Sequence, residues 1–516
     1  MASRRTACAA VCAAILAAVA GGADPGPHSE WVYPGADGKL AYKTLPAGDR
    51  IMDFSAAGYR GGGVPLPDVP VVRPVAPSGG DDAAAVQAAL DAAAQLPSVN
   101  GIRGAVLLGP GTFQCGKALT IRAGGVVLRG SGSGDGGTVL RLTGRPHVAV
   151  TVGGRAEAKA AGRPTAITDA YVPAGATTVT VADAAGFKPG DSVRVTRPVT
   201  AKWVEFMGMG QLTRNGRPET WLKAPGEITT ERTVAAVAGN RLTFDVPLTD
   251  SFDARYLNPP GATVTKLAAS ARITEVGVEH LRIVSPPQPV GIDQPHHRAV
   301  SLRGAADAWV RDVTVVDTVN SVSVGSCRRV TVEDVNITHT VPTTGAAKPA
   351  DFAADGTQVL FHRCSVTGDN LFYFVTGARV TGPIVLLNCT FRGNGWLQPH
   401  QRWATGLLVD GCQVPGGSID FMNRGYYGSG HGWTVGWAVA WNCTAKRFVV
   451  QRPPGAMNWA IGCVGKRETA AAPGGDGTKQ PEGIYDSHGS PVAPASLYLA
   501  QLRDRLGPQA VKNLGY

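Results

Sequence analysis

Charged residues are scarce in this sequence, at 17% of the chain, while glycine (67) and proline (37) are plentiful. Long surface helices need many charged side chains, so this composition argues against a helical protein and favours short strands joined by tight turns. Runs rich in Lys and Arg are also missing, which argues against a nucleic-acid partner although the formal net charge is +10. That charge suits an anionic partner such as an acidic polysaccharide.

No apolar run is long enough to cross a bilayer, neither the one within residues 1–20 nor any later one, so no membrane anchor is expected. Residues 1–20 instead have the features of a secretory signal peptide. Arg4 and Arg5 form a positive start, an apolar stretch follows over 7–19, and a small-residue cleavage site, Ala-Val-Ala, ends the segment. We therefore expect a secreted protein, extracellular or periplasmic, that is a monomer and has no membrane partner.

The spacings typical of zinc sites, H-x-x-x-H and C-x-x-C, do not occur, so a zinc centre is not expected. Seven cysteines follow the expected signal peptide: Cys115, Cys327, Cys364, Cys389, Cys412, Cys443 and Cys463. An exported protein can form disulfides, but seven is an odd number, and free cysteine packs well as a small apolar side chain. The sequence leaves open a ladder of buried thiols or at least one disulfide, and we favour the ladder.

Five of these cysteines occupy one position in a recurring pattern. They lie in VLFHRCSV, IVLLNCTF, LLVDGCQV, WAVAWNCTA and NWAIGCVG, at intervals of 25, 23, 31 and 20 residues. Val313 and Val335 hold the same position in two earlier stretches. Apolar residues five and three places before the cysteine, and two places after it, predict two strands separated by a short turn. Repeats of this length that cannot bury their own apolar face predict a solenoid of stacked coils.

The segment before the repeats has its own order of elements. The stretch GDDAAAVQAALDAAAQLP (80–97) predicts a helix, and GAVLLGPGTF (104–113) predicts a strand. This order resembles the entrance of the pectate-lyase-like superfamily, in which a DD-x-A-A-x-Q-A-A helix caps the solenoid and a G-x-V-x-L-P-x-G-x-F strand begins the first coil. The resemblance implies an all-β fold, a right-handed parallel β-helix with an N-terminal capping helix.

Other patterns divide the chain further. Antiparallel strand patterns over 177–195 and 231–248 predict a small β domain inserted between coils, and PASLYLAQLRDRLG (494–507) predicts a C-terminal helix. The expected segments are a signal peptide (1–20), an extended leader (21–47), the N-terminal cap and first coils (48–165), the inserted antiparallel β domain (166–270), the main coils with the site loops (271–466), and a linker with the C-terminal helix (467–516).

One window, residues 371–467, combines aromatic and basic residues with few acids. It holds six of the ten Trp and nine Lys or Arg, but only Asp410 and Asp420 as acids. An indole face stacks on a sugar ring, and an arginine pairs a carboxylate through two parallel hydrogen bonds. The window therefore favours binding of an acidic sugar, with about half of its Trp expected to be structural.

Polar residues gather in the predicted loops of this window. His400 and Arg402 are two apart and would face the same side of an extended segment. The candidate catalytic residues are His400, Arg402, Arg424, Tyr426, Tyr427 and His431. The candidate substrate-binding residues are Trp396, Trp403, Asn423, Trp433, Arg452 and Asn458, with His297 and Arg298 from an earlier coil.

The superfamily resemblance implies degradation of an acidic polysaccharide, with β-elimination from a uronic acid as the leading chemistry. A cation neutralises the carboxylate, a base removes the proton on C5, and an acid protonates the departing glycosidic oxygen. Arg402 and Arg424 would hold the carboxylate, because arginine stays charged. His400 or His431 would be the base, and the other histidine or a tyrosine at 426–427 would be the acid.

The sequence leaves open whether the protein binds Ca²⁺. Pectate lyases of the superfamily use acid-rich Ca²⁺ sites, and the two acids of the window argue against such a site there. Four acids in earlier coils keep Ca²⁺ possible: Asp312, Asp317, Asp334 and Asp369.

Two other functions compete with a lyase. The stretch GHGWTVG (430–436) resembles the G-H-G-x-S-I-G segment of polygalacturonases, but Trp433 and Thr434 depart from it and the companion motifs are missing. Hydrolysis needs two carboxylates beside the bond, and Asp410 and Asp420 are the only pair in the window. A β-helix surface protein that binds glycans without cleaving them is the third alternative.

Overall fold

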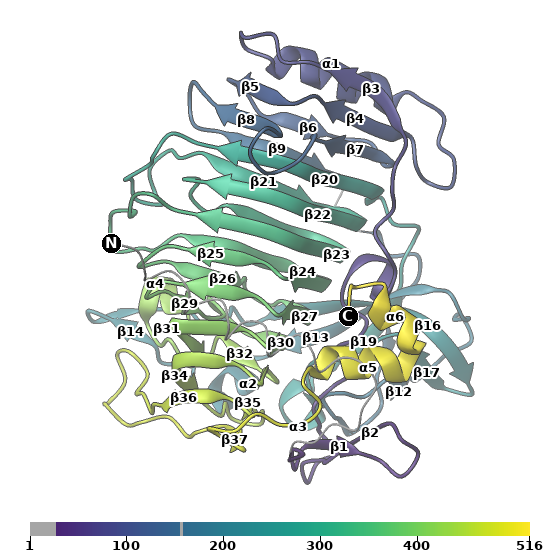
Figure 1. Cartoon of the computed structure of the whole chain (residues 1–516). Helices are drawn as coiled ribbons and strands as arrows, with labels where there is room; N and C mark the ends of the chain where they lie inside the picture. The colour runs from purple at the N-terminus through teal and green to yellow at the C-terminus, as the bar shows by residue number, and fades with distance from the viewer. Residues whose placement is uncertain (1–26, 155–157) are drawn as a thin grey trace.

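Strands rather than helices build the computed structural model, which describes residues 27–154 and 158–516. The expected signal peptide and residues 21–26 of the expected leader lie outside the described residues. Twenty-five strands join in one parallel sheet, in which each strand pairs with its counterpart in the next coil. Figure 1 shows the stack of coils, from purple at one end to yellow-green at the other. The fold is a parallel β-helix. Because crossover connections between parallel strands are right-handed in nearly all proteins, the right-handed sense of the coil stays a prediction.

The strands align in three columns, one for each face of a coil. The first column contains β3 (Val71–Val75), β4 (Gly104–Leu108), β7 (Val126–Arg129), β20 (Ile273–Val284), β22 (Ala305–Val316), β23 (Val322–Thr338), β24 (Ala350–His362), β27 (Thr381–Leu387), β30 (Ala404–Asp410), β33 (Val439–Trp441), β35 (Trp459–Ile461) and β37 (Ile484–Asp486). The second contains β5 (Gly111–Cys115), β8 (Thr138–Leu142), β25 (Ser365–Thr367), β28 (Thr390–Arg392), β31 (Gln413–Phe421), β34 (Thr444–Val450) and β36 (Val464–Arg467). The third contains β6 (Leu119–Ile121), β9 (Val148–Gly153), β21 (Arg298–Arg303), β26 (Phe372–Thr376) and β29 (Trp396–Leu397). Long strands such as β23 and β31 turn a corner and belong to more than one column.

The cysteine position marks one corner of each coil. The residue before it adopts the left-handed backbone conformation in five successive coils, at Arg363, Asn388, Gly411, Asn442 and Gly462. Glycine and asparagine tolerate this conformation best, which explains their recurrence in the pattern. The seven cysteines in the described part of the chain are all free and buried, so the coils contain a ladder of thiols and not a disulfide.

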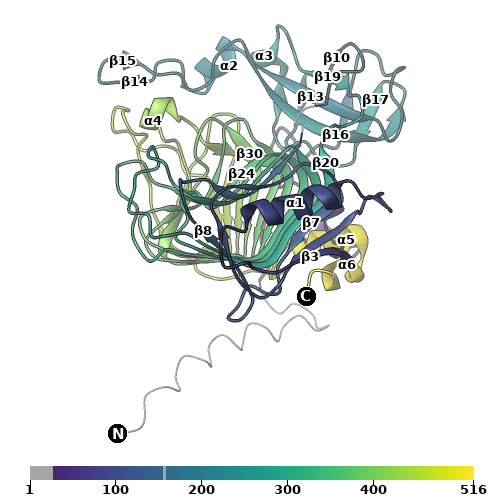
Figure 2. The ribbon, with the colours of Figure 1, turned by 90° about the horizontal axis from the view of Figure 1, so that it is seen from above.

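The outer face of the first column is covered along much of its length, and strands such as β27 and β30 are therefore buried on both sides. An antiparallel sheet lies beside it, formed by β10 (Thr165–Ala166), β19 (Thr263–Lys266), β13 (Ser192–Val199), β16 (Gly226–Ala238), β17 (Arg241–Phe244) and β12 (Thr178–Thr180). We call these strands and their connections the inserted sheet (Figure 2). The buried guanidinium of Arg232 joins it to the coils by donating to the carbonyls of Pro247 and Gly382. Burial on both faces explains the continuous apolar runs of the first column.

Short helices and hairpins complete the fold. Helix α1 (Ala83–Ala94) packs Val86 and Leu90 onto the core of the first coils. Helix α5 (Leu497–Leu506) lies against the later coils, with Ser496 accepting from the Leu499 amide as its N-cap. The short strand β32 (Val435–Gly436) pairs with β30 and belongs to the first column. The remaining elements are β1 (Val32–Pro34), β2 (Leu40–Tyr42), η1 (Tyr59–Gly61), β11 (Tyr171–Val172), α2 (Ala201–Phe206), β14 (Thr213–Arg214), β15 (Arg217–Pro218), β18 (Phe252–Asp253), α3 (Ala254–Leu257), α4 (Tyr427–Gly430) and α6 (Pro508–Lys512). In the described part of the chain, no helix is long and apolar enough to cross a membrane.

Candidate active site and the adjoining aromatic cavity

Two loops between consecutive coils carry the predicted catalytic residues. The first connects β29 to β30 and is not extended, because Arg402 and Trp403 have φ of 51° and 63°. The expectation that His400 and Arg402 share one side of a strand is therefore wrong. The His400 amide bonds to the Thr376 carbonyl in the preceding coil, and the Arg402 amide bonds to the His431 carbonyl in the following loop.

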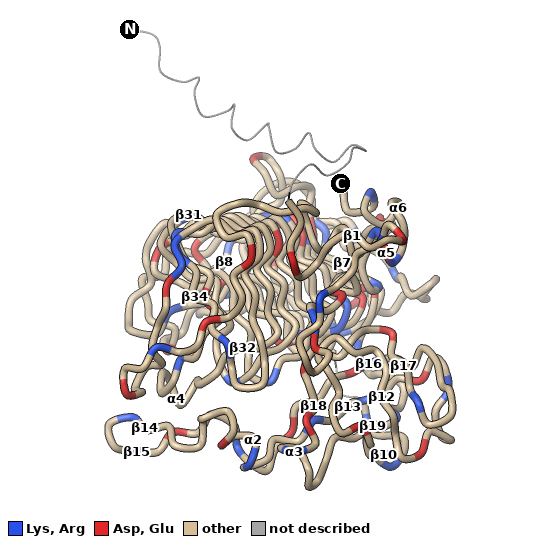
Figure 3. The backbone as a smooth tube through the Cα atoms, turned by 90° about the horizontal axis from the view of Figure 1, so that it is seen from below, with Lys and Arg blue, Asp and Glu red and all other residues tan. Residues whose placement is uncertain are grey.

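The second loop, residues 423–433, closes on itself through a bridge between Asn423 and Trp433. Glycine is required at position 428, where φ is 61° and a Cβ atom would collide with the His431 imidazole. The inserted sheet holds this loop from outside: Arg214, in the hairpin β14–β15, donates to the Gly428 carbonyl at 2.7 Å. Figure 3 shows that hairpin beside α4.

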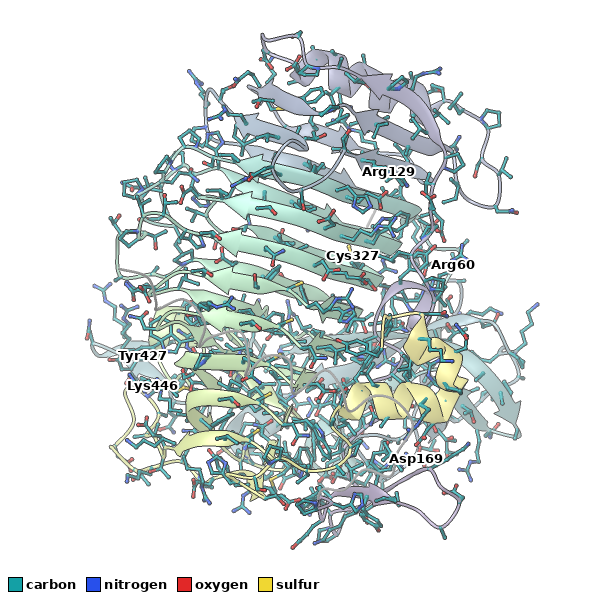
Figure 4. The ribbon with its side chains drawn as sticks, viewed as in Figure 1. Arg60, Arg129, Asp169, Cys327, Tyr427 and Lys446 are labelled. Atoms are coloured by element: carbon teal, nitrogen blue, oxygen red, sulfur yellow. The ribbon has the colours of Figure 1, made fainter. Side chains whose placement is uncertain are left out.

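The two loops bring His400 and His431 into contact, with ring centroids 4.6 Å apart. The Arg424 guanidinium donates to the His400 carbonyl at 2.8 Å and lies over the rings of Phe372 (5.3 Å) and Tyr427 (6.0 Å). We call His400, Arg402, Arg424, Tyr427 and His431 the histidine–arginine cluster. Tyr427 is 46% exposed and lies at the outer edge of the later coils (Figure 4).

Arg402 completes the histidine–arginine cluster and links it to α4 and to the inserted sheet. Its guanidinium donates to the Ser429 hydroxyl at 2.8 Å and to the Thr220 carbonyl at 3.3 Å. Among the described residues, neither Arg402 nor Arg424 forms an ion pair with a carboxylate within 4.0 Å. The cluster therefore has two guanidinium groups whose charge is not neutralised by contact.

Burial and the neighbouring arginines keep both histidines neutral. Burial, with Arg424 and Arg402 nearby, lowers the pKa of His400 to about 4. Burial, with His400 and the same arginines nearby, lowers the pKa of His431 to about 3. Burial also lowers the pKa of Arg424 to about 10, so the guanidinium stays charged at neutral pH. The His431 Nδ1 atom is buried and has no hydrogen-bond partner among the described residues.

A cavity of about 980 Å³ adjoins the cluster, on the other side of loop 423–433. Five predicted site residues line it: Trp403, Asn423, Tyr426, Trp433 and Arg452. The inserted sheet and its connections supply most of the opposite wall, including Arg197, Trp203, Phe206, Asp250 and Tyr256. Tyr426 thus faces the cavity, apart from the histidine–arginine cluster.

Some predicted binding residues have structural roles. Asn458 is fully buried, and its amide bonds to the Ala438 amide and to the carbonyls of Val435 and Gln451, so its prediction as a substrate-binding residue is wrong. Trp433 is buried and donates to the Met207 carbonyl at 3.1 Å, which secures a wall of the cavity.

The remaining predicted binding residues lie in the third column. Trp396 is half-buried and packs on Phe372, 5.6 Å between rings, beside Arg424. His297 and Arg298 do not join the cluster, because β23, β24 and β26 separate their strand from β29. His297 is buried, and its Nδ1 accepts from the His147 amide at 3.2 Å.

The carboxylate pair that hydrolysis would need is not present in the form the sequence suggested. Asp410 is buried under α5, where it accepts from the Ser496 hydroxyl and the Tyr498 amide. Asp420 belongs to a different column, is also buried, and accepts from Gln398 and Ser418. Burial raises the pKa of Asp410 to about 7 and that of Asp420 to about 6. The two carboxyl groups therefore do not flank one glycosidic bond.

The four aspartates that the sequence offered as possible Ca²⁺ ligands each contact other residues instead of one another. Asp312 pairs with His280 at 2.7 Å, Asp334 pairs with Arg363 at 2.9 Å, and Asp317 accepts from Thr340. Asp369 accepts from the Asn394 amide. Within the described ranges no group of three or more His, Cys, Asp or Glu side chains is arranged to hold a metal ion. These residues do not fit the acid-rich Ca²⁺ site that the resemblance suggested.

Sequence reasoning missed the residues that the inserted sheet contributes. Asp250, Arg197 and Trp203 lie more than 150 positions before loop 423–433, and only the Trp-containing stretch between the predicted strands could have drawn attention to them. Their role depends on a contact between the inserted sheet and the coils, which no local pattern records.

No family model and no curated protein matches this chain. Among solved structures, the chain is similar to the tailspike protein gp49 of Pseudomonas phage LKA1 at 13% identity and a TM-score of 0.42, over 75% of this chain and 64% of that one. It is similar to the tailspike of E. coli bacteriophage HK620 at 10% identity and a TM-score of 0.40, over 88% and 68%. The A-module of the mannuronan C-5 epimerase AlgE6 of Azotobacter vinelandii matches at 13% identity and a TM-score of 0.29, over 85% and 98%.

These similarities are weak in two respects. The chain spans slightly less than two thirds of the length of the LKA1 tailspike, and each of the three TM-scores is below 0.5. The parallel β-helix is therefore established by the strand register, as the resemblance to the pectate-lyase-like superfamily predicted, and function is argued from the site itself.

Proposed function

We propose that this protein is a secreted polysaccharide lyase that cleaves an acidic, uronate-containing polysaccharide by β-elimination at the histidine–arginine cluster. One observation carries the proposal: two neutral histidines in contact lie beside two arginines that have no carboxylate partner in the described chain. Such a cluster combines unneutralised positive charge with unprotonated bases. These are the two properties that elimination from a uronate requires.

We assign the steps of the reaction to the groups of the cluster as follows. The uronate carboxylate binds between Arg402 and Arg424 and spreads the negative charge that develops on C5. One imidazole of the pair His400–His431 takes the C5 proton, the C–H electrons form the C4=C5 double bond, and the C4–O glycosidic bond breaks. The departing oxygen takes the phenolic proton of Tyr427. The imidazolium then releases the C5 proton to solvent, and the Tyr427 phenolate takes up a proton from solvent.

Substrate binding itself changes the basicity of the histidines. In the free protein burial is the main cause that favours the neutral imidazole, and the positive charges of Arg402 and Arg424 add to it. A bound carboxylate offsets the contribution of the arginines and so raises the histidine pKa, which makes the imidazole a better proton acceptor, while the contribution of burial remains. An anionic substrate therefore raises the basicity of the histidine that accepts its proton, whereas a neutral sugar does not.

Absorbance measurements on a panel of acidic polysaccharides test the proposal. Elimination produces an unsaturated uronate that absorbs in the ultraviolet; hydrolysis releases reducing ends without this absorbance; a binding protein produces neither. We expect absorbance from the wild type, and a loss of at least about 100-fold in His400→Ala. His296→Ala is the matched control, because this histidine lies in an earlier coil and bonds to Asn320. Reducing ends without absorbance, or wild-type rates in His400→Ala, would contradict the proposal.

A further inference from the structure

A single carboxylate organises the aromatic wall of the 980 Å³ cavity. Asp250, which follows β17, accepts from the Trp403 indole at 2.8 Å and from the Trp437 indole at 3.1 Å. Arg197 in β13 lies 3.3 Å from the same carboxylate. Because Asp250 and the two indoles are buried, these bonds fix both rings against the cavity.

The inserted sheet adds a second aromatic surface opposite the coils. The Arg197 guanidinium lies 4.0 Å from the Trp203 ring centroid, and the Trp203 ring in turn packs edge-on against Trp403 at 5.8 Å. Phe206 and Tyr256 stack at 4.0 Å between centroids in the same wall. Sugar rings bind to aromatic faces that are held rigidly in this way, since little side-chain freedom is lost on binding.

Of the three arginines that line the cavity, Arg197 and Arg255 pair with aspartates, and Arg452 is the one without an ion pair among the described residues. The acids of the cavity are engaged: Asp49 accepts from Tyr171 at 2.7 Å, Asp253 pairs with Arg255 at 2.6 Å, and Asp250 is bonded as described. The Arg197 Nη1 atom is buried without a hydrogen-bond partner among the described residues. Arg452 is exposed at the edge and belongs to no ion pair in the described chain. An anionic group is the complement of this arrangement.

We infer that the cavity is a binding subsite for an acidic sugar unit, built by the inserted sheet and separate from the reacting bond. The sugar ring packs on the partly exposed rings of Phe206, Tyr256 and Tyr426, which lie in front of the buried indoles that Asp250 positions, and its carboxylate pairs with Arg452. Loop 423–433 is the wall between the two places: Asn423 and Tyr426 line the cavity, whereas Arg424 and His431 belong to the cluster. The inference rests on the proposed function and names where a unit adjoining the cleaved bond is held.

Binding measurements in a His400→Ala background test the subsite without turnover. The probes are tetrasaccharides of galacturonate and of mannuronate, with cellotetraose as the neutral comparison, followed by calorimetry and by tryptophan fluorescence. Arg452→Ala removes the charge at the edge, Arg452→Lys retains it, and Ala47→Trp places an indole at an exposed position of the lining. Arg163→Ala is the control, an exposed arginine elsewhere in the chain.

We expect at least one acidic tetrasaccharide to bind and to change tryptophan fluorescence. Its Kd rises by about tenfold in Arg452→Ala, recovers in part in Arg452→Lys, rises in Ala47→Trp, and is unchanged in Arg163→Ala. Equal binding of cellotetraose, no binding of either acidic probe, or unchanged affinity in Arg452→Ala and Ala47→Trp overturns the subsite. A failure of the proposed lyase function is distinguishable from a failure of the subsite. In that case the wild type forms no unsaturated product, but the acidic tetrasaccharide still binds and its binding still depends on Arg452.

Discussion

Asp410 offers a sharp test of the energetics of the later coils. Its carboxyl group is fully buried between β30 and α5, where one oxygen accepts from Ser496 and Tyr498 and the other has no partner among the described residues. Burial raises its pKa from 3.8 to about 7. In Asp410→Asn the accepting oxygen is retained and the titration is removed, so the two proteins should differ in how stability depends on pH.

The sign and size follow from proton linkage. Between pH 3.8 and about 7 the unfolded chain releases the proton of Asp410 while the folded protein keeps it, so stability falls as pH rises. About 3 pH units at about 1.4 kcal/mol each amount to about 4 kcal/mol, present as a penalty above pH 7 and absent below pH 3.8. At about 2 cal/mol/K of unfolding entropy per residue, this corresponds to about 4 °C in Tm for cooperative unfolding of a chain of this length.

Calorimetric unfolding of wild type and Asp410→Asn at several pH values measures this difference. We expect the variant to gain Tm relative to wild type as pH rises from 4.5 to 8, by up to about 4 °C. Asp293→Asn, an exposed acid in a loop, is the control and should show no such trend. A Tm difference between Asp410→Asn and wild type that is the same at every pH would refute the reasoning.

Three further predictions concern the site and the core. Replacing Arg424 with Met should lower kcat by about 100-fold. It also removes a positive charge beside His400, so the histidine pKa should rise and the acidic limit of the pH profile of kcat/KM should move to higher pH. A limit at the same pH as in the wild type would contradict the electrostatic argument. Cys389→Ser should lose about 1–3 kcal/mol of stability in denaturant unfolding, because a hydroxyl replaces a buried thiol. A reducing agent should leave the Tm of the wild type unchanged, and a fall in that Tm would indicate a disulfide. Chelation by EDTA should leave the initial rate of elimination unchanged, because the acids of the earlier coils are engaged elsewhere; loss of rate that Ca²⁺ restores would show a metal site.

Local regularities in the sequence predicted much of the fold. The cysteine pattern located a corner in each coil because a left-handed residue must precede it, and residues such as Asn388 and Gly411 suit that conformation. The helix over 83–94 follows from the spacing of Val86 and Leu90 in the same way. These features depend on a few neighbouring residues, so the sequence records them directly.

The site was predicted only in part, because its geometry depends on loops. The local pattern identified His400, Arg424 and His431 as candidates, yet it suggested an extended segment around Arg402, where the backbone is left-handed. Asn458 was predicted to bind substrate and is fully buried. Loop conformation is set by contacts with adjacent coils and with the inserted sheet, and these contacts are distant in sequence.

The sequence by itself determined the solenoid, since stacking is the only way for repeats with one apolar face to bury it. It also predicted an acidic-sugar site in the window 371–467, where aromatic and basic residues gather with few acids. Only the tertiary structure decided which residues act together. It placed His400 against His431, separated Asp410 from Asp420, and brought Asp250 from the inserted sheet to the cavity. The physical reason is that a repeat pattern specifies the path of each coil, whereas the position of an insertion is set by long-range packing.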